Sequence, residues 1–188
     1  AFERMSDEDR PVVQSAHGRY YGTLLDAQKQ HVMTAGEHEM LNTIDANFDN
    51  IMVAWSHLLE EIERGRQSAI DLLGTYASLL SLYFERRSMF RDGERTFEGA
   101  LKRISESSLE AEVIDQLCLL LELALAPNAL QLGHFRRVAE TLTSLLPLLR
   151  TPQNRHNMAI ALTHLGVAYM RLGEYEPATH SVIESLGM

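Results

Sequence analysis

The sequence has little cysteine and few basic residues, and each shortage excludes a class of protein. Its one cysteine, Cys118, has no partner within the chain, so a disulfide scaffold is excluded. The 17 Lys and Arg residues are outnumbered by 26 Asp and Glu residues, which gives a net charge of −9. Because phosphate binding needs an excess of basic side chains, direct contact of this chain with nucleic acid is disfavoured.

Long apolar runs are also missing. The uncharged runs at 72–84 and 123–135 each contain 13 residues, short of the roughly 18 that a membrane span requires. The 45% hydrophobic content is nevertheless that of a globular protein and not of a disordered one. We therefore expect a soluble, acidic, cytoplasmic protein of a reducing compartment, with no contact with the membrane.

Apolar residues recur every three or four positions through nearly the whole chain, which predicts α-helices. No stretch alternates regularly between apolar and polar residues, so no strand is predicted. The helix between 66 and 87 is apolar almost all round, which indicates burial on both sides. The predicted helices cover residues 11–34, 37–64, 66–87, 90–103, 108–132, 134–149, 152–172 and 174–186.

Several residues mark the predicted helix ends. Thr151-Pro152 predicts an N-cap followed by the first helical residue, and Gly173 predicts the residue just past a helix end. Ser107-x-x-Glu110 has the pattern of a capping box for a helix that begins near residue 108. The loops between helices are short, so sequential helices are expected to pack antiparallel.

The C-terminal helices carry a repeat pattern. It consists of Leu162-x-x-Leu165-Gly166-x-x-Tyr169, Gly173-x-Tyr175, Ala178-x-x-x-Val182 and Ser185-Leu186. This pattern resembles the tetratricopeptide repeat, in which two antiparallel helices cross closely at small residues. Here Gly166 and Ala178 are the small residues. Weaker copies lie 40 and 85 residues earlier, which predicts units at about 74–107, 119–152 and 159–188, the last one truncated.

The resemblance implies an all-α fold of antiparallel helix pairs stacked as a right-handed solenoid over residues 66–188. Pro127 falls inside the first helix of the second unit and should kink or end it near Ala126, because proline lacks a backbone N–H. Pro147 should end or bend the next helix near Leu146 for the same reason.

Residues 1–65 resemble a different feature, a helical junction of bacterial signal-transduction ATPases that include LuxR-type transcription factors. The resemblance rests on Phe2-Glu3-Arg4-Met5, His17-x-x-Tyr20-Tyr21-x-x-Leu24 and Leu41-x-x-Ile44-x-x-Asn47-Phe48-Asp49-Asn50-Ile51-x-x-Ala54-Trp55. It implies an N-terminal helix pair that joins an ATPase region to the repeats. The absent initial Met and the truncated last repeat lead us to expect an excerpt of a longer regulator.

Residue patterns of catalysis, metal binding or cofactor binding are missing. The chain has no P-loop, no G-x-G-x-x-G and no G-x-S-x-G, and none of its eight histidines lies three or four residues from another. We therefore expect no enzyme activity, no metal and no cofactor. The histidines are expected to be solvated or to cap helices, Asp45 and Asp49 to form a solvated acidic face, and Cys118 to be a buried hydrophobe.

The function expected from these resemblances is non-enzymatic binding of a protein or peptide. The module would be the sensor or autoinhibitory part of a larger transcriptional regulator, and the ATPase domain of that regulator is one candidate partner. A homodimer could form through exposed terminal helices. By analogy with the repeat family, the candidate groove residues are Ser78, Leu82, Glu85, Arg86, Leu123, Leu130, Gln131, Thr163, Val167, Met170 and Arg171.

A different class of function stays open as an alternative. An apolar pocket between the N-terminal helix pair and the first repeat could hold a small-molecule effector. Its walls would be the aromatic residues Trp55, Tyr76, Tyr83 and Phe84.

Overall fold

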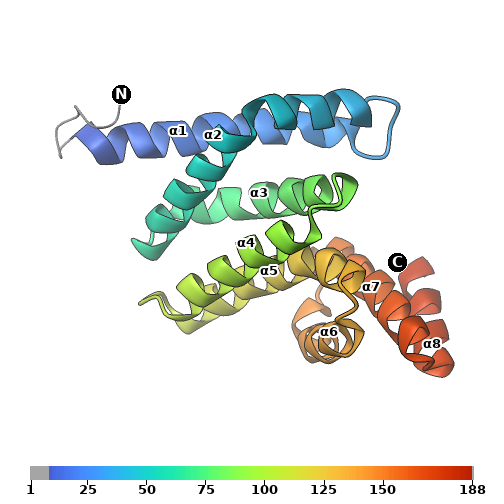
Figure 1. Cartoon of the computed structure of the whole chain (residues 1–188). Coiled ribbons are helices and arrows are strands. Elements are labelled where there is room, and N and C mark those ends of the chain that lie inside the picture. Colours follow the sequence, from blue (N-terminus) through green and yellow to red (C-terminus); the bar gives the residue numbers. More distant parts are fainter. Residues whose placement is uncertain (1–8, 188) are drawn as a thin grey trace. The chain divides into compact units, whose positions relative to one another are not determined.

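The computed structural model describes residues 9–187, and these residues form helices joined by short connections (Figure 1). The helices are α1 (Asp9–Gln28), α2 (Glu37–Glu63), α3 (Gln67–Arg86), α4 (Phe90–Ser105), α5 (Ala111–Gln131), α6 (Phe135–Leu149), α7 (Arg155–Leu172) and α8 (Tyr175–Leu186). Two short 3₁₀ turns, Lys29–His31 and Pro152–Asn154, follow α1 and precede α7. The all-helical prediction is confirmed, since the described residues include no strand.

The predicted helix ends are confirmed in part. Gly173 adopts a left-handed backbone with φ of 79°, and the N–H of Glu174 donates to the carbonyl oxygen of Tyr169 at 2.9 Å. This is the glycine-dependent helix end that the sequence predicts. The capping box is wrong, because the Ser107 hydroxyl donates backwards to the carbonyl oxygen of Ile104, and the next helix begins only at Ala111.

Neither proline ends its helix, although the sequence predicted that each would end or bend the helix that contains it. α5 continues through Pro127 to Gln131, and α6 continues two residues past Pro147 to Leu149. The residues on both sides of Pro127 are buried, from Leu123 to Ala126 and from Asn128 to Leu130. Burial of this apolar segment offsets the lost hydrogen bond, because tertiary packing supplies most of a helix's stability in a protein.

The described residues divide into two compact units. Unit 1 comprises residues 9–83 and Lys102–Leu117, and unit 2 comprises Phe84–Leu101 and residues 118–187. Three helices, α3, α4 and α5, each contribute residues to both units. We describe each unit by itself.

Unit 1 has an aromatic interior whose hydroxyl groups are hydrogen-bonded. Tyr76 is fully buried, and its hydroxyl donates to the carbonyl oxygen of Gly18 at 2.7 Å, which ties α3 to α1. The Tyr83 hydroxyl donates to the Asp45 carboxylate at 2.7 Å, which ties α3 to α2. Buried tyrosines need such partners, because an unpaired buried hydroxyl is costly. These bonds fix where the three helices meet.

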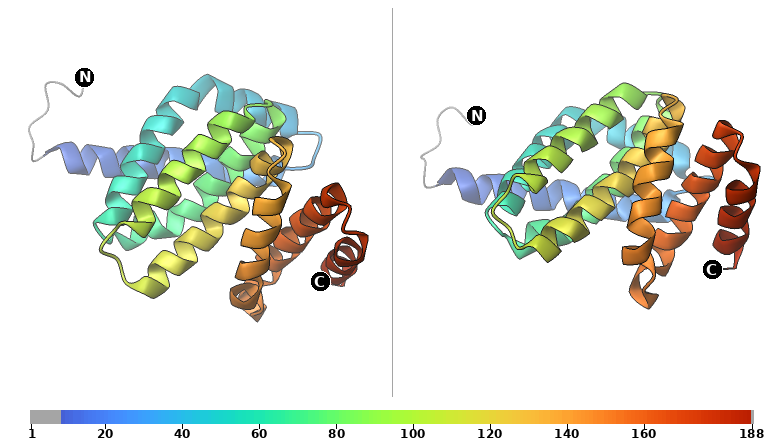
Figure 2. Two further views of the ribbon diagram at one scale, coloured as in Figure 1. Left: turned by 60° about the horizontal axis from the view of Figure 1, so that its bottom comes forward. Right: turned by 90° about the horizontal axis from the view of Figure 1, so that it is seen from below.

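Unit 2 has close helix crossings made by small residues. A Cβ atom built on Gly166 of α7 would lie 2.8 Å from a Val182 methyl of α8 and 3.6 Å from the carbonyl oxygen of Ala178. The hydroxyls of Thr163 and Ser185 lie 3.1 Å apart on the same two helices. Thr163 lies next to Ser185, and Gly166 lies next to Val182. Since the partner number falls as the α7 number rises, α7 and α8 run antiparallel, as Figure 2 also shows.

Ion pairs link α4 to α6 and α6 to α8 in unit 2. The ion pairs are Glu98–Arg137 between α4 and α6, and Arg136–Glu174 and Arg150–Glu184 between the ends of α6 and α8. The Glu94 carboxylate also lies 2.8 Å from His134 Nδ1. Glu94 meets His134 and Glu98 meets Arg137, so α4 and α6 run in the same direction. The protein is all-α, and mostly sequential helices pack together, as α1 does with α2, α6 with α7 and α7 with α8.

Candidate functional site

The predicted groove residues fall in both units and differ in exposure. Ser78 and Leu82 belong to unit 1, and the others belong to unit 2. Leu123 and Leu130 are buried and leave little surface for a ligand. Of the remainder, Ser78, Arg86, Gln131, Thr163, Met170 and Arg171 are exposed, whereas Leu82, Glu85 and Val167 are half-buried.

Four of these residues share α7. The Thr163 hydroxyl donates to the carbonyl oxygen of Ala159 and lies next to Ser185, so it takes part in the packing of α7 on α8. Met170 and Arg171 are exposed at the end of α7, and Val167 is half-buried between them and Thr163. The α7 residues therefore present a mixed surface without a dense cluster of one charge.

The aromatic residues of the alternative effector pocket are packed side chains. Trp55, Tyr76 and Tyr83 are buried in unit 1, and the ring centroids of Trp55 and Tyr76 lie 6.2 Å apart. Burial raises the pKa of Tyr76 far above its usual value, as expected for a phenol without access to water. Phe84 is buried in unit 2 against Phe97. These residues build the interiors of the two units.

An exposed apolar surface lies on α8, and none of its residues was among the predicted groove residues. Tyr175, Ile183 and Leu186 are 70%, 64% and 83% exposed, and Val182 is also exposed. Together with Thr179 they lie on one side of the helix, spaced by three, four or seven residues, and we call this set the α8 outer face. The opposite side, which includes Ala178 and Ser181, is buried.

The border of the α8 outer face is acidic. Glu176 and Glu184 are exposed on the side of α8 that lies beyond Ile183, with His180 between them. The Glu184 carboxylate lies 3.3 Å from the Arg150 guanidinium. Among residues 9–187, no basic side chain forms an ion pair with Glu176. The signal was present in the sequence as Val182-Ile183 next to Leu186, but Val182 was considered only as a position of the repeat pattern.

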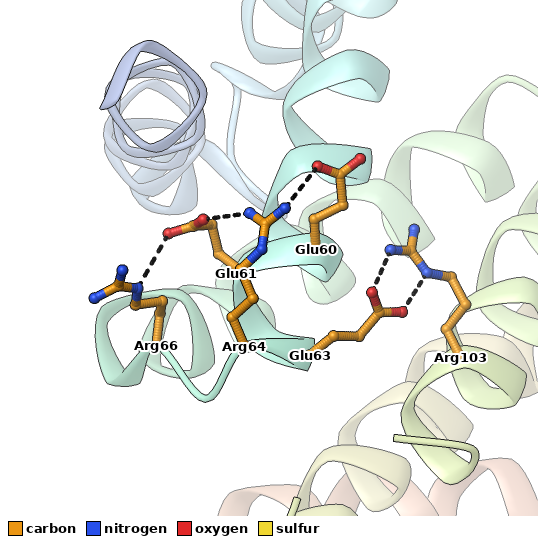
Figure 3. Close-up of polar contacts among 6 residues, drawn as sticks. All are labelled: Glu60, Glu61, Glu63, Arg64, Arg66 and Arg103. Carbon is orange, nitrogen blue, oxygen red and sulfur yellow. Dashed lines mark hydrogen bonds and ion pairs between the residues drawn. The ribbon is translucent and has the colours of Figure 1, made fainter. Parts of the chain in front are cut away.

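Unit 1 carries a group of charged side chains at the end of α2 (Figure 3). The Arg103 guanidinium donates two hydrogen bonds to the Glu63 carboxylate, at 2.7 and 2.9 Å, and these bonds lower the pKa of Glu63. Glu61 is buried and lies 2.8 Å from the Arg64 guanidinium and 3.9 Å from that of Arg66. Each carboxylate shown has a basic partner, so the group links the end of α2 to the neighbouring segments of unit 1.

Three histidines differ from the expectation of solvated side chains. His17 of α1 and His57 of α2 are half-buried, with ring centroids 5.6 Å apart. Burial, and to a smaller degree His57, lowers the pKa of His17. Burial alone lowers the pKa of His164 in unit 2 to about 4. Sequence spacing could not show the His17–His57 contact, because 40 residues separate the two rings.

Two other expectations change at single residues. Asp45 is exposed, but it accepts the hydrogen bond from Tyr83 and so serves the packing of α2 and α3. Cys118 is half-buried instead of fully buried. In the described part of the chain, no three His, Cys, Asp or Glu side chains gather as metal ligands would.

One helix of the described residues, α5, is long and apolar enough to cross a membrane. Its most apolar window is 56% buried inside the protein, and the core helix of a soluble protein passes the same test.

No protein-family model, curated protein or solved structure matches this chain. The proposal of a function therefore rests on the residues and geometry described above.

Proposed function

We propose that this chain is a helical module that binds a protein partner and has no catalytic role. The observation that carries the proposal is the α8 outer face, where Tyr175, Ile183 and Leu186 are more than half exposed on one short helix. Single exposed apolar residues are common on soluble proteins, but a contiguous group on one helix marks an interaction site.

The resemblance to tetratricopeptide repeats supports the same proposal. The close crossing at Gly166 and the left-handed turn at Gly173 occur where that resemblance requires them. In this proposal the helix pairs stack as a right-handed solenoid, and the module is the sensor or autoinhibitory part of a larger transcriptional regulator. The partner is then the regulator's own ATPase domain.

Nucleotide turnover tests the autoinhibitory proposal. The natural reading frame would be extended upstream to its P-loop and winged helix, and the ATPase region would be purified with and without residues 1–188. We expect the added module to lower turnover in a saturable way. Unchanged turnover together with no binding of the two parts, or an upstream sequence without a P-loop, would refute the autoinhibitory role.

A further inference from the structure

The α8 outer face has the dimensions of a single helix. α8 has 12 residues, so it is about 18 Å long and about 10 Å wide with its side chains. One helix laid along α8 matches the size of the surface.

The pattern of the face also fits a helix. Tyr175, Thr179, Val182 and Leu186 follow the i, i+4, i+7, i+11 spacing, and Ile183 widens the apolar stripe toward solvent. Helices that dock on such a stripe present anchor residues at the same spacing from their own side. The backbone of α8 needs no rearrangement for this, because the side chains are already exposed.

Charge decides which kind of helix fits. The solvent border of the stripe carries the carboxylates of Glu176 and Glu184, and α8 itself contains no Lys or Arg. The Glu184 carboxylate already has a basic partner, since it lies 3.3 Å from the Arg150 guanidinium. A docked helix with acidic borders would face these carboxylates, whereas one with basic borders would pair with Glu176.

We propose that the α8 outer face binds an amphipathic helix of a protein partner whose apolar stripe is bordered by Lys or Arg. This inference rests on the proposed function, because it names the surface and the partner chemistry of the same binding module. Affinity comes from burial of Ile183 and Leu186, and selection between helices comes from the acidic border.

Three synthetic helical peptides of about 18 residues test the proposal by fluorescence anisotropy against the full chain. The first has a leucine stripe bordered by lysine, the second has the same stripe bordered by glutamate, and the third scrambles the lysine peptide. We expect the lysine-bordered peptide to bind about tenfold more tightly than either other peptide at low salt, and the difference to shrink at high salt.

Variants on the outer face test the location. The double variant Ile183→Ser with Leu186→Ser should weaken binding of the lysine-bordered peptide about tenfold or more, since it removes exposed apolar groups without adding charge. Val12→Ser is the matched control, because Val12 is an equally exposed aliphatic residue on α1, and it should leave binding unchanged. Glu176→Lys should reduce the preference for the lysine-bordered peptide about threefold.

Several outcomes would overturn the proposal. Equal binding of the lysine- and glutamate-bordered peptides would refute the charge selection, and full binding by the double variant would refute the surface. A dimer in light scattering that the double variant abolishes would assign the face to a second copy. If the double variant loses inhibition of the ATPase region but the lysine- and glutamate-bordered peptides bind the parent chain equally, this inference fails and the proposed function stands.

Discussion

The two units are stabilised in different ways. Unit 1 joins its helices through large rings with bonded hydroxyls, such as Tyr76 on Gly18 and Tyr83 on Asp45. Unit 2 brings α7 and α8 together at a glycine, where no side chain fits between the helices. Directional bonds make unit 1 sensitive to the loss of single polar atoms, whereas close packing makes unit 2 sensitive to added volume.

The largest expected effect is overpacking of unit 2. Gly166→Arg should lower the free energy of unfolding by about 3–5 kcal/mol, because the new side chain meets Val182 and the Ala178 carbonyl. Ala178→Asp should act in the same direction by burying a carboxylate in this crossing. Thermal denaturation followed by circular dichroism measures both.

Gly99 provides the control within unit 2. A Cβ atom built on Gly99 meets nothing within 4 Å, and the residue is exposed on α4. Gly99→Ala should therefore raise stability by about 0.5–1 kcal/mol through helix propensity. If Gly166→Arg melts within about a degree of the parent chain, the helix crossing is not where we place it.

The second effect is acid destabilisation of unit 2 through His164. Its pKa of about 4 in the folded chain lies below the usual value of 6.5, so the unfolded chain binds the proton first as pH falls. The contribution of neutral His164 to folding stability is fully present above pH 6.5. It is lost progressively as pH falls to about 4, by up to about 3 kcal/mol. Urea denaturation at pH 7.5 and 5.0 measures this loss, which His164→Gln should reduce.

His17 provides the corresponding measurement in unit 1. Its pKa is also lowered, so His17→Gln should also flatten the dependence of unfolding free energy on pH. The change should be smaller than for His164→Gln, because His17 is less buried. If the two variants flatten the pH dependence equally, the prediction that His164 of unit 2 contributes more than His17 of unit 1 is wrong.

The third effect is loss of a directional bond in unit 1. Tyr76→Phe removes the hydroxyl that donates to the Gly18 carbonyl and leaves the ring in place. Because the carbonyl then lacks this donor in a buried position, stability should fall by about 1–2 kcal/mol. Chemical denaturation measures the change, and Tyr175→Phe, an exposed tyrosine of unit 2, should leave stability unchanged.

The smallest effect concerns partly exposed ion pairs. Glu63→Gln in unit 1 should cost about 0.5–1 kcal/mol, because Arg103 donates two hydrogen bonds to that carboxylate in fixed geometry. The lowered pKa of Glu63 means that this contribution is present at neutral pH and is lost as pH falls below about 4.5. Glu98→Gln, which removes the more exposed pair with Arg137, should cost less.

Much of the fold could be predicted because helix periodicity is a local signal. The helix from 37 to 64 was expected from its apolar spacing and is found at Glu37–Glu63. Local rules failed where packing competes with them. Pro127 was expected to kink or end its helix, and the buried residues around it let α5 continue to Gln131. Ser107 had a capping pattern, but its hydroxyl bonds to the preceding helix.

The candidate site was harder to predict than the helices. The groove residues were assigned by analogy, and two of them, Leu123 and Leu130, are buried. The α8 outer face was missed because an apolar residue at a helix position does not show which side a neighbour covers. Val182 illustrates this, since it contacts Gly166 and is still 45% exposed.

The sequence by itself determined the all-helical class, the number and approximate ends of the predicted helices, and the turn at Gly173, since these depend on spacing and backbone preference within a few residues. Only the tertiary structure decided which side chains meet across the chain. It brought His17 to His57, tied Tyr76 to Gly18 and left Leu186 in solvent. Burial and long-range contact depend on neighbours distant in sequence, and no local pattern contains them.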